Sequence, residues 1–80
     1  MASNTNTTRV TIYVPLLGEG VPVLRPTEAI MRRDGVYEVL ATPDYDPEDE
    51  VWEFPPGTLV CCQWEERGGE KILVARRRPE

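Results

Sequence analysis

The sequence predicts a small all-β fold, a single bent sheet of five to six short strands that closes into a barrel. Its 80 residues allow one domain, which at this size buries only about 60% of the unfolded chain's surface. Eight prolines and six glycines argue against a helical bundle, because proline breaks helix interiors. Several segments alternate apolar and polar residues, which is typical of half-buried strands. Closing one sheet into a barrel also removes its exposed edges.

The first strand is predicted at residues 9–16, where the alternation is most regular. The residues expected on one face are Val10, Ile12, Val14 and Leu16, and those expected on the other are Thr11, Tyr13 and Pro15. The polar residues before it, 1–8, lack the apolar segment of a signal peptide, so we expect a disordered N-terminal tail and an intracellular, cytoplasmic protein.

A long early loop follows. Gly18-Glu19-Gly20 ends the first strand, and Val21 to Pro26 are expected to form an edge or an irregular segment, because proline cannot donate to a strand ladder. Thr27 could cap a helical turn, but a seven-residue helix is marginal. Asp34-Gly35 is typical of a hairpin turn, so we expect Glu28 to Arg33 to pair with Val36 to Thr42.

The last two strands are predicted at Thr58 to Glu66 and Lys71 to Arg77, joined by a turn at Gly68-Gly69. In the penultimate strand, Val60, Cys62 and Trp64 are expected to share one face. These limits define one domain over residues 9–77, followed by a C-terminal tail at residues 78–80.

An acidic loop precedes the penultimate strand, within the segment Pro43 to Gly57. Trp52 and Phe54 are two positions apart and should share a face, which predicts that both rings plug the open end of the barrel. The carboxylates and Tyr45 would then point outward. In the alternative interpretation, Trp52 anchors a partner protein.

Two stretches, residues 21–29 (VPVLRPTEA) and 44–61 (DYDPEDEVWEFPPGTLVC), resemble a group of small bacterial proteins of unassigned function. The resemblance covers roughly residues 9–76. It implies an SH3-like β-barrel and carries over no catalytic or binding residues.

Charge is distributed unevenly along the chain. The net charge is −5, but residues 34–66 contain ten acidic side chains and no Lys or Arg, so the two flanks together carry +5. Either the fold brings the flanks to the middle and cancels these charges, or the acidic segment presents its carboxylates to a partner.

Several chemistries find little support. The chain has no histidine, which removes the usual near-neutral base and a common metal ligand. Cys61 and Cys62 are adjacent, so they cannot easily bond to each other, and no cation flanks them in sequence to activate a thiol. The acidic loop begins like an EF-hand, but Asp49 replaces the required glycine and Pro55 the required glutamate. We therefore expect no enzyme activity, no cofactor and no metal site.

The sequence favours a non-enzymatic protein-binding or accessory module that recognises a basic partner protein. The residues expected to face that partner are Asp44, Tyr45, Asp46, Glu48, Asp49, Glu50 and Trp52. Neutralising the five carboxylates of this set should leave the fold intact. In the alternative, a nucleic acid binds the arginine clusters, and its contacts would be Arg32, Arg33, Arg76, Arg77 and Arg78. No membrane span is expected, because no apolar run is long enough.

Overall fold

The computed structural model describes residues 8–80, which form six β-strands and no helix. The strands are β1 (Arg9–Leu17), β2 (Leu24–Arg33), β3 (Val36–Val39), β4 (Val51–Trp52), β5 (Leu59–Arg67) and β6 (Glu70–Arg77). The prediction of an all-β fold is confirmed. The tail predicted at residues 1–8 lies outside the described residues except for Thr8.

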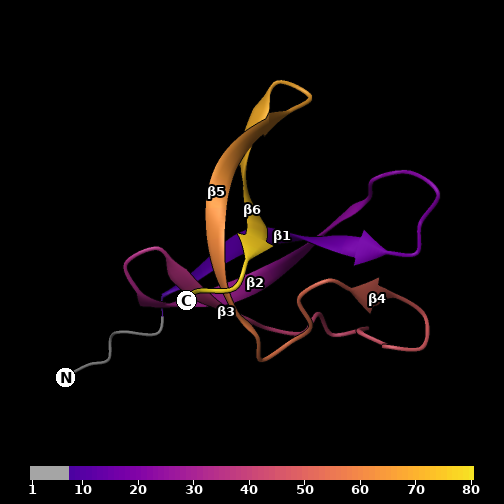
Figure 1. Ribbon diagram of the computed structural model, residues 1–80, viewed down its shortest axis with the longest axis horizontal. Coiled ribbons are helices and arrows are strands. Elements are labelled where there is room, and N and C mark those ends of the chain that lie inside the picture. The colour runs from indigo at the N-terminus through magenta and orange to yellow at the C-terminus, as the bar shows by residue number, and fades with distance from the viewer. Residues whose placement is uncertain (1–7) are drawn as a thin grey trace.

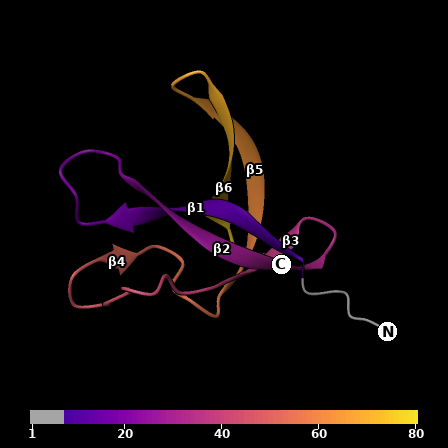
Figure 2. The same cartoon turned by 180° about the vertical axis from the view of Figure 1, so that it is seen from behind.

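The sheet closes in a ring. Its strand order is β2-β3-β5-β6-β1, and an additional pairing of β1 with β2 completes the circle. β4 attaches to the end of β1, where Leu17 lies opposite Val51. The contact between β1 and β6 is the only parallel one among the pairings of the described strands. Figures 1 and 2 show β5 and β6 rising from the crossed β1 and β2 as a projecting hairpin, with β4 beside the far end of β1.

The alternation in β1 is confirmed: Ile12 and Val14 are fully buried, while Thr11 is exposed. The adjoining strand begins earlier than predicted, because Leu24 to Pro26 belong to β2, and the early loop is limited to residues 18–23. Pro26 lies opposite Tyr13. The Leu16 amide donates to the Val23 carbonyl, so the alternation of an antiparallel ladder makes Tyr13–Pro26 a non-hydrogen-bonded pair. The proline is tolerated there because no ladder bond needs its amide.

The hairpin between β2 and β3 is confirmed. Gly35 has a φ of 79°, the left-handed conformation that the turn requires. β3 ends at Val39, earlier than the predicted Thr42, because its partner β5 begins only at Leu59 and the residues before it form a turn in which the Thr58 amide donates to the Pro55 carbonyl. The register shifts between Met31 and Arg33, because Arg32 is an extra residue of β2 with no directly opposed residue on β3.

The hairpin of β5 and β6 turns at Gly68-Gly69 as predicted, with φ values of 58° and 86°. Val60 is buried and Cys62 packs against the core, but Trp64 on the same predicted face is 67% exposed. The reason is position: β5 runs on past the ring into the projecting hairpin (Figure 1). The alternating pattern identified the face correctly but could not show where the core ends.

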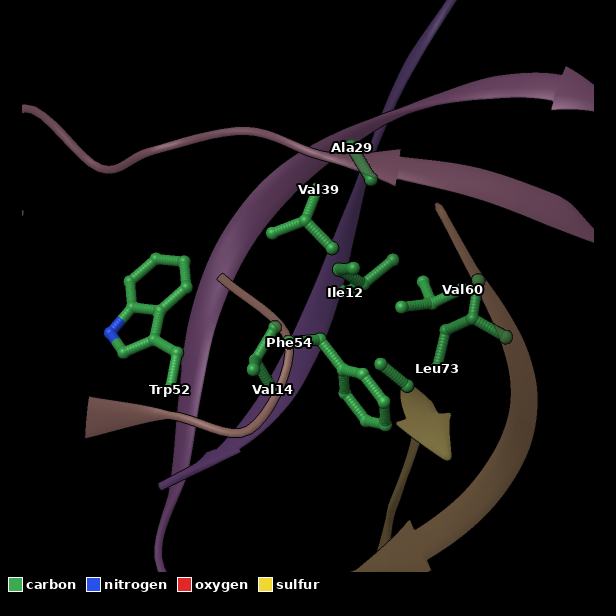
Figure 3. Close-up of a cluster of buried hydrophobic side chains, with 9 residues drawn as sticks. Ile12, Val14, Ala29, Val39, Trp52, Phe54, Val60 and Leu73 are labelled. Atoms are coloured by element: carbon green, nitrogen blue, oxygen red, sulfur yellow. The ribbon is translucent and has the colours of Figure 1, made fainter. Parts of the chain in front are cut away.

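The core lies inside the ring and draws on every strand. Its buried members are Ile12, Val14, Ala29, Val39, Trp52, Phe54, Val60, Leu73 and Ala75 (Figure 3). One buried polar side chain, Thr27, donates its hydroxyl to the Leu40 carbonyl at 2.6 Å, which ties β2 to the segment after β3. The core is made mostly of small aliphatic side chains, so the two large rings of Trp52 and Phe54 occupy much of its open end.

The residues predicted as a C-terminal tail contact the rest of the domain. The Arg78 guanidinium lies 5.6 Å from the centre of the Phe54 ring, and Pro79 is half-buried. The Arg78 guanidinium therefore packs on the face of the Phe54 side chain. No helix in residues 8–80 has the length and apolar character needed to cross a bilayer.

Candidate acidic interaction surface

The acidic loop, residues 44–50, is the second part of the connection from β3 to β4 and is folded by its own hydrogen bonds. The Asp46 carboxylate accepts from the Glu48 amide at 2.9 Å, and the Asp46 carbonyl accepts from the amides of Asp49 and Glu50 at 2.9 and 3.0 Å. Pro47 presets the backbone angle at the start of this turn. The loop is therefore a compact turn with a defined shape.

Arg25 on β2 holds the end of the acidic loop. Its guanidinium forms a bidentate pair with Glu50, in which Nε donates to Oε1 at 3.0 Å and the second bond runs from a terminal nitrogen to Oε2. The Trp52 indole nitrogen also donates to Glu50 Oε1, at 3.2 Å. The hydrogen bond from Arg25 lowers the pKa of Glu50, while the same bond raises the pKa of Arg25, with further contributions from the charges of Asp44 and Asp49.

Aromatic packing holds the other half of the loop. The Tyr45 ring meets the Trp52 ring edge-on, with centroids 4.7 Å apart and planes at 69°. Trp52 and Phe54 are each 3% exposed, so the prediction that both rings lie inside is confirmed. Trp52 therefore lies beneath the predicted partner-facing surface, and Tyr45, half-buried, links that surface to the core.

The remaining carboxylates of the loop stay on the surface. Asp44, Asp46, Glu48 and Asp49 are all exposed, and within residues 8–80 none of them forms an ion pair. A notch of about 120 Å³ lies among Asp44, Asp46, Asp49, Glu50 and Arg25. Asp44, Asp46 and Asp49 form no ion pair within residues 8–80, and the one cation of the notch, Arg25, is paired with Glu50. The notch therefore keeps an excess of negative charge, which favours a positively charged group.

Elsewhere, the flanking arginines neutralise acids of the middle segment. Arg32 Nε donates to Glu38 at 2.8 Å, and Glu65 accepts from Arg67 at 2.8 Å and from Arg76 at 2.7 Å. The bonds from Arg76 and Arg67 lower the pKa of Glu65. The charge-cancelling interpretation therefore holds for Glu38, Glu50 and Glu65 and does not hold for the exposed carboxylates of the acidic loop.

Of the five arginines predicted to contact a nucleic acid, three are already engaged by other side chains and two are not. Arg32, Arg76 and Arg78 are engaged by Glu38, Glu65 and the Phe54 ring, respectively. Arg33 and Arg77 form no ion pair within the part of the chain that the structure describes, and both line a shallow depression of about 610 Å³. Asp34 and Glu80 line the same depression, so its positive charge is offset.

Residues 8–80 contain no group of three or more Cys, Asp or Glu side chains arranged to hold a metal ion. The two cysteines are free and half-buried. Burial, with a smaller contribution from Cys61, raises the pKa of the Cys62 thiol from 9.0 to about 11.

Cys62 should therefore react slowly with alkylating agents. A rise in pKa from 9.0 to about 11 reduces the thiolate fraction near neutral pH by a factor of about 100. We expect iodoacetamide at pH 7.5 to modify Cys62 at about one hundredth of the rate of free cysteine, as followed by mass spectrometry of the digested protein. Modification of Cys62 at the rate of free cysteine would show that the thiol is not held in this environment.

The contact between Arg25 and Glu50 should make stability depend on pH. Because folding lowers the pKa of Glu50 below its ordinary value of 4.5, its stabilising effect is complete above that pH and is lost as the pH falls through the lowered pKa. In Arg25→Gln the carboxylate loses this partner. We expect the difference in urea midpoint between wild type and Arg25→Gln to stay constant from pH 7 to about 5 and to shrink at lower pH. An equal difference at pH 7 and at about pH 2 would contradict the assignment.

Sequence reasoning missed Arg25 as part of the site. Arg25 lies 25 residues from Glu50, and no periodicity connects the two. Arg25 comes close to Glu50 because β1 pairs with β2, which carries Arg25, and also with β4, which Glu50 directly precedes. The prolines on either side of Arg25 indicated only an edge or an irregular segment.

Comparison of the chain with protein-family models, with curated proteins and with solved structures finds no match.

Proposed function

We propose that this protein is a non-enzymatic interaction module that binds a basic partner protein through its acidic loop. The observation that carries the proposal is the contrast within the loop. Glu50 is paired with Arg25, and Tyr45 packs on Trp52, while the carboxylates between and beside them are exposed and form no ion pair within residues 8–80.

Preorganisation supports this proposal. A loop already fixed by the Asp46 turn and by Arg25 loses little conformational entropy when a partner binds. The notch beside Asp44, Asp46 and Asp49 offers carboxylate acceptors to one Lys or Arg head group. Concentrated charge of one sign also accelerates the encounter with a partner of the opposite sign.

The fold that we propose is an SH3-like barrel of the kind implied by the resemblance to small bacterial proteins. A five-stranded ring with an accessory strand, built from strongly bent hairpins, is consistent with that architecture. In this proposal the ring is a scaffold, and the loop between β3 and β4 carries the function.

Affinity capture from the source organism tests the proposed function. The bait is the wild-type chain, and the matched control is a variant with Asp44, Asp46, Glu48 and Asp49 changed to Asn or Gln. We expect nuclease-resistant recovery of a basic protein by the wild type and its loss with the variant. Recovery that depends on nucleic acid, or that is equal for both baits, would contradict the proposal.

A second candidate function is binding of nucleic acid at Arg33 and Arg77. It is favoured by one observation: the guanidinium groups of Arg33 and Arg77, which form no ion pair within residues 8–80, line one depression. Two phosphate contacts predict a salt dependence of only about −1.8 in log K against log salt. Heparin and a lysine-rich peptide discriminate the candidates, because the acidic loop should bind the peptide and the Arg33–Arg77 depression should bind heparin.

A further inference from the structure

A row of four directly opposed residues crosses the outer face of the sheet from β2 to β6. Arg33 on β2 lies opposite Val36 on β3, and Val36 lies opposite Cys61 on β5. Cys61 in turn lies opposite Arg77 on β6. Directly opposed residues of antiparallel strands point to the same side of a sheet. Cys62, the next residue of β5, packs against the core, so this row points away from the core.

A β-bulge beside each end of the row turns an arginine to the outer face. Arg32 is an extra residue of β2 next to Arg33, and Arg76 is an extra residue of β6 next to Arg77. Ala75 is buried in the core, and strict alternation would turn Arg77 to the same side. The extra residue places Arg77 opposite the thiol instead, and the bulge in β2 acts on Arg33 in the same way.

The whole row lines the shallow depression of about 610 Å³ described above. Val36, which is 6% exposed, supplies apolar lining, and the Cys61 thiol beside it is half-buried. Arg33 and Arg77 are exposed and form no ion pair within residues 8–80. The thiol therefore lies in a depression that carries an unpaired guanidinium at each end of the row.

The two acids of the depression lie outside this row. Asp34 belongs to the turn between β2 and β3, and Glu80 lies three residues beyond the end of β6. Neither is directly opposed to Cys61 across a strand pair, whereas Arg77 is. The charge held beside the thiol by the sheet is therefore positive. Partly exposed thiols in electropositive surroundings are typical sites of modification.

We propose that Cys61 is a modification site that forms a mixed disulfide with an anionic low-molecular-weight thiol, whose carboxylates meet Arg77 and Arg33. The oxidant is the disulfide of that small thiol. The Cys61 thiolate attacks one of its sulfur atoms, a new S–S bond forms, and the old S–S bond breaks. The other half of the small disulfide leaves as a thiolate and takes up a proton. This site is separate from the acidic loop and does not depend on the proposed function.

Cys62 should not release the small thiol from Cys61. Adjacent Cα atoms are about 3.8 Å apart, less than the roughly 4.4–6.8 Å usual for a disulfide, and neighbouring strand side chains point to opposite faces. Burial also raises the pKa of the Cys62 thiol to about 11, so it is a poor nucleophile near neutral pH. The mixed disulfide on Cys61 should therefore accumulate until another thiol is added.

Two small disulfides of similar size and opposite charge test this site. Dithiodipropionate carries carboxylates, and cystamine carries ammonium groups. Each is incubated with the full chain at low salt, and tandem mass spectrometry locates the adduct after digestion. Each rate is divided by that of free cysteine with the same reagent. On this scale we expect Cys61 to react at least about fivefold faster with dithiodipropionate, the factor that corresponds to one charge pair about 4 Å apart in water.

Arg77→Gln should reduce this ratio to about one. Arg33→Gln should reduce it less, because Val36 separates Arg33 from the thiol, and Asp34→Asn should increase it. The matched control is Arg9→Gln, which removes an exposed arginine of β1 that lies outside the depression. This control should leave the ratio unchanged. Circular dichroism melting of each variant verifies that the fold is retained.

Three results would overturn the proposal. The first is an equal relative rate for the two reagents in the wild type, and the second is a ratio that Arg77→Gln and Arg9→Gln reduce alike. The third is an adduct on Cys62 in place of Cys61. A loss of two hydrogens without an adduct, which marks a disulfide between Cys61 and Cys62, would also contradict it.

Discussion

Trp52→Ala is expected to destabilise the protein by about 3–5 kcal/mol, the usual cost of removing a large aromatic ring from a core. The ring is 3% exposed and packs with the core at the open end of the closed sheet. It also carries the edge contact with Tyr45 and the hydrogen bond to Glu50. Urea unfolding followed by circular dichroism measures this loss directly.

Trp64→Ala is the matched control for Trp52→Ala, because it removes the same ring from a position that is 67% exposed. Surface substitutions of this kind usually change stability by no more than about 0.5 kcal/mol. If Trp52→Ala unfolded at the same urea concentration as Trp64→Ala, the burial of Trp52 described above would be incorrect.

Neutralising Asp44, Asp46, Glu48 and Asp49 together is expected to weaken binding of a basic peptide about 30-fold at low ionic strength. This value assumes about 0.5 kcal/mol for each exposed carboxylate. Asn at position 46 can still accept the bond from the Glu48 amide, so the turn is kept. Thermal stability should be unchanged or slightly higher, because four like charges no longer repel one another. Isothermal titration calorimetry measures the affinity.

Glu50 is kept in the variant with the four loop carboxylates neutralised. The sequence groups it with the other carboxylates, but its pairing with Arg25 makes it part of the framework. The matched control changes Glu19, Asp34, Glu66 and Glu70, four exposed acids without ion pairs in residues 8–80, to Gln or Asn. Net charge then changes equally, and affinity should fall far less. Equal losses would show that the peptide responds to overall charge and not to the loop.

Much of the fold follows from local signals in the sequence. Alternation placed β1 and its buried face, and the two glycine-containing turns placed both later hairpins, because these features depend on a few neighbouring residues. The spacing of Trp52 and Phe54 predicted that both rings point inward.

The rest depends on contacts between residues far apart in the sequence. β4 is two residues long, and only its pairing with the end of β1 makes it a strand. The roles of Arg25 and Glu50 and the alignment of Leu17 with Val51 arise from ring closure in the same way. In the sequence, Glu50 cannot be distinguished from the other carboxylates of the loop, because its partner Arg25 lies 25 residues away.

The most direct test of the central claim is to map a basic peptide onto the protein by ¹⁵N–¹H NMR. During titration of the ¹⁵N-labelled chain with the lysine-rich peptide, we expect shift changes in the backbone amides of residues 44–51. These changes should be absent in the variant with the four loop carboxylates neutralised. The account would be contradicted if those amides stayed unchanged while the signals of Arg33 and Arg77 shifted on addition of heparin.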